Sequence, residues 1–154
     1  AALKKKQFSK YDFSRLHPGG NLGKQLKTVG DIMTTGTRIP FISESKKLRE
    51  AIKIISKKKL GVVIVRNRNK TTTGIITDGN IRKLKQKNID FQKTLVKNVM
   101  TKNPITITSD SLAVKALRIM NEKKITSLCV INAKNSNKTT GLIHIHHILE
   151  TNIE

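Results

Sequence analysis

The sequence predicts an α/β fold of the mixed α+β kind, built from two tandem repeats that each run β-α-β-β-α. Three observations predict it: a duplicated motif, two stripes of apolar residues at helical spacing, and two pairs of short apolar runs separated by polar turns. A chain of 154 residues has room for two half-domains that share an interface. Aliphatic side chains must build the core, because aromatic residues make up only 3% and Trp is absent.

Each repeat opens with the same motif. Val29–Thr34 reads Val-Gly-Asp-Ile-Met-Thr, and about 67 positions later Val96–Thr101 reads Val-Lys-Asn-Val-Met-Thr. A short β-branched stretch follows each motif, Ile39–Ile42 in the first repeat and Ile105–Thr108 in the second. Each unit is therefore expected to begin with a short strand.

A helix is expected next in each repeat. Its apolar stripe consists of Leu48, Ala51, Ile52 and Ile55 in the first repeat and of Leu112, Ala116, Leu117 and Met120 in the second. Ser43 and Ser45 precede the first helix and are expected to cap its start. Lysines end both helices, at 57–59 and 123–124, as the helix dipole favours.

Two strands and a second helix complete each unit. We expect strands at Val62–Val65 and Gly74–Thr77 in the first repeat and at Ser127–Ile131 and Gly141–His144 in the second. Polar residues at 67–70 and 135–138 form the turns between them. The closing helices are expected at Asp78–Lys87 and Ile145–Thr151.

The charge of +21, from 31 basic and 10 acidic residues, raises the question of a nucleic-acid partner. The basic residues are spread along the chain rather than gathered into one stripe, and a bias towards Lys, Ile and Asn would produce the same balance. The low aromatic content also argues against a platform for stacking bases. We therefore do not expect a nucleic-acid partner.

The apolar runs and the single cysteine indicate where in the cell the protein is expected. No apolar run approaches the ~18 residues that a membrane span requires, and no signal-peptide core follows the lysines at 4–6. The single cysteine, Cys129, lies in an apolar, strand-like run and is expected to be a buried, unpaired thiol. We expect a cytoplasmic protein without a membrane partner.

The duplicated pattern resembles the CBS domain pair, a family named after cystathionine β-synthase. The resemblance covers roughly Val29–Asn152 and depends on the Ile-Met-Thr motif, on Leu60–Val63 after the first helix, and on Gly-Ile-Ile-Thr-Asp at 74–78. It implies one repeat at 29–95 and another at 96–154, packed as a pair with two-fold pseudo-symmetry. It also implies self-association as a homodimer.

Residues 1–28 belong to neither repeat. Phe13–Gly23 reads Phe-Ser-Arg-Leu-His-Pro-Gly-Gly-Asn-Leu-Gly, which resembles the junction between the sugar isomerase (SIS) domain and the CBS pair of arabinose-5-phosphate isomerases. The Pro and paired Gly also form a turn, so His17 is alternatively a residue that flanks this turn. The resemblance implies that 1–28 is the end of the SIS domain plus a linker, and that His17 belongs to an incomplete catalytic site. We expect this fragment alone to be inactive.

The resemblance also implies a function. These enzymes interconvert ribulose 5-phosphate and arabinose 5-phosphate for the Kdo of lipopolysaccharide, and the CBS pair would be their regulatory, ligand-sensing and oligomerisation module. We expect no required cofactor but a small anionic regulator, CMP-Kdo or alternatively AMP or ATP, bound between the repeats. Higher oligomers are expected in the parent enzyme. The alternatives are a purely structural dimerisation element and a basic module that binds nucleic acid.

The resemblance places candidate ligand-binding residues at the strand ends. In the first repeat they are Thr77, Asp78, Asn80 and Arg82, of which Arg82 suits a phosphate. Thr77 and Asp78 are equally good helix caps. Many CBS repeats that bind nucleotides have Asp three residues after the strand-end Ser or Thr, whereas this chain has Asn80 and, in the second repeat, His147. That departure weakens the case for adenosine nucleotides.

The end of the second repeat holds three of the four histidines, His144, His146 and His147. Such a cluster raises the possibility of a metal site, but the family that the chain resembles has a related His-x-His there that is not a metal site. We therefore expect no metal and assign the three histidines to ligand binding.

Overall fold

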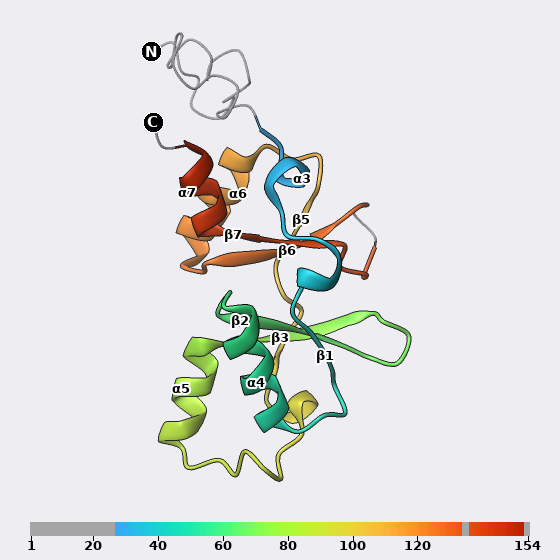
Figure 1. Cartoon of the computed structure of the whole chain (residues 1–154), viewed down its shortest axis with the longest axis vertical. Helices are drawn as coiled ribbons and strands as arrows, with labels where there is room; N and C mark the ends of the chain where they lie inside the picture. Colours follow the sequence, from blue (N-terminus) through green and yellow to red (C-terminus); the bar gives the residue numbers. More distant parts are fainter. Residues whose placement is uncertain (1–26, 134–135, 153–154) are drawn as a thin grey trace.

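The computed structural model describes residues 27–133 and 136–152, which form two small sheets with helices on their outer faces (Figure 1). The first repeat contains β1 (Phe41–Ser43), α4 (Leu48–Lys58), β2 (Val62–Arg66), β3 (Thr72–Thr77) and α5 (Asp78–Gln86). The second contains β5 (Thr106–Thr108), α6 (Ala113–Lys123), β6 (Ser127–Ile131), β7 (Gly141–His144) and α7 (Ile145–Asn152). Both follow the predicted β-α-β-β-α order, which confirms the fold class. None of the described helices is long and apolar enough to cross a membrane.

Four short elements precede these units: α3 (Val29–Ile32), η1 (Gly36–Arg38), η2 (Val96–Asn98) and β4 (Thr101–Lys102). The sheets have the strand orders β1-β2-β3-β4 and β5-β6-β7. The first pair in each sheet is parallel, because a helix crosses over between the two strands, and the second pair is antiparallel. Val62 therefore lies opposite Thr77, and Ser127 lies opposite His144.

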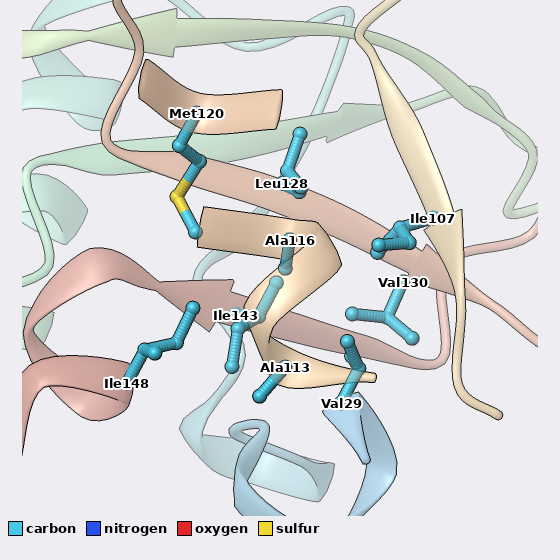
Figure 2. Close-up of a cluster of buried hydrophobic side chains, with 9 residues drawn as sticks. All are labelled: Val29, Ile107, Ala113, Ala116, Met120, Leu128, Val130, Ile143 and Ile148. Atoms are coloured by element: carbon cyan, nitrogen blue, oxygen red, sulfur yellow. The ribbon is translucent and has the colours of Figure 1, made fainter. Parts of the chain in front are cut away.

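The segment that leads into each repeat packs on the other repeat. Val29, from the start of the first repeat, lies in the second repeat's core with Ile107, Val130 and Ile143 (Figure 2). Val96, from the start of the second repeat, lies in the core of the first. β4 likewise extends the first sheet by pairing with β3. Each repeat is thus completed by the other, and neither has its full core alone.

The two sheets face each other across a third apolar cluster. Its buried members are Ile39, Val62, Ile64, Cys129 and Leu142. Burial raises the pKa of the Cys129 thiol to about 11, so the thiol stays protonated and inert, as its apolar surroundings suggested. Thr72 and Thr139, which are 67 positions apart, meet through their hydroxyl oxygens at 2.6 Å. This contact between equivalent residues lies where a pseudo-two-fold axis would relate the repeats.

The prediction that Ser43 and Ser45 cap α4 is wrong. Their hydroxyls bond to each other at 3.0 Å, and α4 has no side-chain cap. The first amide of α4, on Leu48, instead donates to the carbonyl of Thr94 (2.8 Å), and that of Ala113 in α6 donates to the carbonyl of Lys27 (2.9 Å). Because the exchanged leading segments supply these carbonyls, the helix starts need no serine.

Candidate ligand-binding site

In the first repeat the predicted polar residues bond to one another. The Thr77 hydroxyl accepts the Asn80 amide N–H (3.2 Å), and the Asn80 side-chain oxygen accepts the Thr77 amide N–H (2.9 Å). These two bonds form a reciprocal capping box at the start of α5. Asp78 and Arg82 are exposed on the same helix. The structure therefore shows the capping role of Thr77, whereas ligand binding by these residues stays a prediction.

In the second repeat the structure brings the three predicted histidines together. His144 ends β7 and is buried, whereas His146 is exposed and His147 is partly buried in the first turn of α7. The Nδ1 atom of His144 accepts the backbone N–H of His146 at 3.1 Å. The His144 ring stacks on His146 with centroids 4.9 Å apart and meets His147 edge-on at 5.9 Å.

The surroundings of this cluster disfavour positive charge on its buried member. Burial lowers the pKa of His144 below its usual value, and His146 and His147 lower it further. The Nδ1 atom of His147 is also buried and has no hydrogen-bond partner among the described residues. Leaving a buried polar atom unpaired costs about 1–3 kcal/mol. A ligand atom that reached His147 would relieve that penalty.

The described part of the chain holds no group of three or more His, Cys, Asp or Glu side chains arranged to hold a metal ion. The geometry explains why the histidine cluster is not such a group. His144 already uses Nδ1 to accept a backbone N–H, and its ring stacks on His146 instead of converging with it on a common point. The cluster is better suited to hydrogen bonding than to metal coordination.

The family follows from the duplicated pattern together with this geometry. The CBS domain model matches residues 29–87 and 96–154. This chain belongs to the CBS domain family. Arabinose 5-phosphate isomerase KdsD of Yersinia pestis is 36% identical to it over 154 residues, which are 99% of this chain and 46% of that protein. The resemblance to the CBS pair of these isomerases is confirmed, and the chain spans about half the length of the relatives it matches.

Solved CBS pairs share the fold. CBSX2 in complex with AMP matches with a TM-score of 0.70 and 22% identity, over 80% of this chain and 94% of that one. The CBS domain pair of protein MJ0100, in complex with 5′-methylthioadenosine and S-adenosyl-L-methionine, matches with a TM-score of 0.71 and 22% identity, over 81% and 94%. At this identity the likeness establishes architecture only.

The remaining sequence-predicted residue, His17, lies outside the described residues. Two surface hollows are lined by none of the described candidate residues. One, of about 200 Å³ beside β5, is lined by Thr106, Ile107, Thr108, Ser111, Lys115, Ile119 and Ile131. The other, of about 290 Å³, is lined by Leu112, Val114, Lys115 and Arg118.

A comparison of the two repeats explains the hollow beside β5. In the first repeat, the Arg66 guanidinium lies 3.6 Å from the centre of the Phe41 ring. The matching strand positions in the second repeat hold Ile131 and Thr106, which are smaller. This hollow was not predicted from the sequence, although aligning β1 with β5 and β2 with β6 shows the loss of both large side chains.

Proposed function

We propose that this chain is the regulatory, ligand-sensing and oligomerisation module of an arabinose-5-phosphate isomerase, and that it binds a nucleotide or nucleotide sugar between its repeats. The observation that carries the proposal is the match of 99% of the chain to 46% of KdsD. The complexes of related folds with AMP and with S-adenosyl-L-methionine support a nucleotide-like ligand. The parent enzyme would act in the cytoplasm, converting ribulose 5-phosphate to arabinose 5-phosphate for Kdo and lipopolysaccharide synthesis.

The exchanged leading segments offer a route from ligand to catalytic domain. The amide of Val29 donates to the Ser111 carbonyl (2.8 Å), and Thr28 forms a β-bridge with Leu112. A ligand that shifted the second repeat would therefore also move Thr28 and Val29, which follow residues 1–26 in the chain. Regulation by this route requires two packing states that the ligand distinguishes.

A purely structural dimerisation element is the second candidate. Leu149 on α7 is 43% exposed, which leaves an apolar side chain available for a second copy. The space between the sheets is also occupied by the apolar cluster around Ile64 and Leu142. This candidate requires no ligand at all.

A thermal-shift titration distinguishes the two candidates. The panel is CMP-Kdo, CMP, AMP, ATP and arabinose 5-phosphate, and a ligand present at 100 times its Kd stabilises the folded state by about 2.7 kcal/mol. A saturable rise in Tm with one of them supports the sensor. No rise with any of them would favour the structural element. A coupled assay is expected to show no isomerase turnover by this chain alone.

A further inference from the structure

We propose that the hollow beside β5 is a second ligand site, which takes a small phosphorylated polyol of the size of a pentose phosphate. None of its lining residues is a candidate for nucleotide binding, so this site goes beyond the proposed function. Only the choice of probe rests on that function, because arabinose 5-phosphate is the product of the proposed parent enzyme. At the equivalent place the first repeat is filled and has a carboxylate, whereas the second is open and has a lysine.

The hollow lies at the opposite end of the second sheet from the histidines. Thr108 pairs with Ile131 at the carboxyl ends of β5 and β6, whereas His144 pairs with Ser127 at the start of β6. Four residues of extended strand separate Ser127 from Ile131, which is about 13 Å. β5 is an edge strand, and Lys115 of α6 lines the other side of the hollow. A small ligand held there therefore does not reach the histidine cluster.

A reversal of charge accompanies the opening of the hollow. α4 and α6 each have 11 residues, and the third residue is Glu50 in α4 and Lys115 in α6. Glu50 is paired with Arg49 at 3.6 Å and with Lys53 at 4.0 Å, but no described carboxylate pairs with Lys115. The residues that line the hollow include this one cation and no carboxylate. The hollow therefore favours an anion.

The anionic group of the ligand belongs at Lys115. This residue also lines the neighbouring hollow of about 290 Å³, together with Arg118. The two cations are three residues apart on α6, so they are neighbours on the helix surface and repel each other. A bound anion reduces that repulsion. The ammonium group is a compact charge with three donors, which suits a phosphate.

Two hydroxyl groups in the hollow are open to a ligand. Thr108 donates its one hydroxyl hydrogen to the Asp110 carboxylate (2.7 Å), so Ser111 is the donor in its 3.0 Å contact with Thr108. The Ser111 oxygen therefore keeps its lone pairs for a ligand, and the Thr106 hydroxyl bonds to no described residue. The apolar part of the lining consists of Ile107, Ile119 and Ile131. Hydroxyls beside an aliphatic wall match the hydroxyls and C–H groups of a polyol.

The size of the hollow sets the size of the ligand. Its volume of about 200 Å³ lies below the roughly 300–1,000 Å³ of pockets that take drug-sized ligands. A nucleotide adds a base to a pentose phosphate and is too large for this space. A single phosphorylated pentose fits the volume, the cation and the hydroxyls together.

The test is isothermal titration calorimetry of this chain with arabinose 5-phosphate, arabinose and inorganic phosphate. We expect arabinose 5-phosphate to bind once per chain, and arabinose and phosphate each to bind at least tenfold more weakly. Lys115→Gln should weaken arabinose 5-phosphate by about tenfold. Lys123→Gln is the matched control, because it removes the same charge from the exposed last turn of α6 and should leave the affinity unchanged.

A second variant tests the hollow itself. Thr106→Phe installs the residue that the first repeat has at the equivalent strand position, Phe41. Thr106 is exposed, so the fold should accept the ring, which circular dichroism checks. The ring should fill the hollow and abolish the binding of arabinose 5-phosphate.

Three results would overturn the inference: no binding of arabinose 5-phosphate, an affinity equal to that of inorganic phosphate, or an affinity that neither Lys115→Gln nor Thr106→Phe changes. Thermal shifts of the same variants with CMP-Kdo, CMP, AMP and ATP keep the proposed function separate. A nucleotide that still raises the Tm of both variants supports the sensor, even if arabinose 5-phosphate does not bind. Binding of arabinose 5-phosphate that both variants abolish supports the second site, and silence of all four nucleotides would then contradict only the nucleotide site.

Discussion

The two repeats share one arrangement of strands and helices but differ in the polar residues at their strand ends. Their strands follow the same register, and Thr72 meets its counterpart Thr139 between them. Yet one strand end carries a closed capping box and the other three histidines. Charge differs too, since residues 27–95 contain 17 basic and 5 acidic side chains and residues 96–154 contain 8 and 4. The duplicated apolar positions hold the fold, which leaves the polar positions free to acquire separate roles.

The largest expected effect distinguishes two equivalent glycines. A Cβ on Gly74 would lie 2.7 Å from the backbone oxygen of Thr101, whereas the three atoms nearest a Cβ on Gly141 all belong to the flexible Met33 side chain. Backbone cannot move aside as a methionine can, so Gly74→Ala should lower the free energy of unfolding by about 3 kcal/mol and Gly141→Ala by about 1 kcal/mol. Urea denaturation measures both. Equal losses would contradict the proposed difference in packing.

Because each leading segment packs on the other repeat, a substitution in the leading segment of one repeat should destabilise the other repeat. Val29 and Val96 are fully buried, so Val29→Ala or Val96→Ala should each lower the free energy of unfolding by about 2 kcal/mol. Amide hydrogen exchange reports local opening of the fold and should show which repeat each valine stabilises. In hydrogen exchange, Val29→Ala should weaken amide protection mainly in β6 and β7, and Val96→Ala mainly in β2 and β3. If each variant instead lost protection mainly in the repeat that contains the valine in the sequence, the exchange of leading segments would be refuted.

The helix ends should respond alike in both repeats. Lys59 and Lys124 each end a helix with φ near +60° (59° and 57°), a conformation that glycine adopts more readily. Lys59→Gly and Lys124→Gly should therefore each raise the free energy of unfolding by about 0.5–1 kcal/mol. Thermal melts of the two variants provide the measurement. A loss of stability in either would show that the lysine side chain contributes more than its backbone strain costs.

The smallest expected effect is a dependence on pH that only the second repeat has. The folded pKa of His144 lies below 6.5, so the unfolded chain takes up this proton at a higher pH than the folded chain. The free energy of unfolding should therefore fall as the pH decreases from 6.5 through the folded pKa. His144→Thr, which copies Thr77, should flatten that part of the profile. His17→Asn is the control for loss of a histidine and should not remove that part of the profile.

Local patterns predicted the elements well, because apolar periodicity directly reflects which face is buried. β6 and β7 have the predicted bounds, and lysines end α4 and α6 as expected. The serine caps failed, since the carbonyls that cap α4 and α6 come from segments distant in sequence. From the sequence alone, helix capping and ligand binding were both predicted as roles for Thr77. The nitrogen of His147 that has no partner in the described part of the chain was not predicted, because its burial depends on the three-dimensional fold and not on spacing along the chain.

The most direct test of the central claim follows the imidazole C–H signals of the histidines by NMR during titration with CMP-Kdo. The chain has four histidines, and His17, which is not a candidate ligand-binding residue, provides a comparison signal. We expect saturable shifts of the His144, His146 and His147 signals that fit one ligand per chain, with little change at His17. Unmoved signals in the cluster while the Tm rises would place the ligand elsewhere, and unmoved signals with an unchanged Tm would contradict sensing of this ligand.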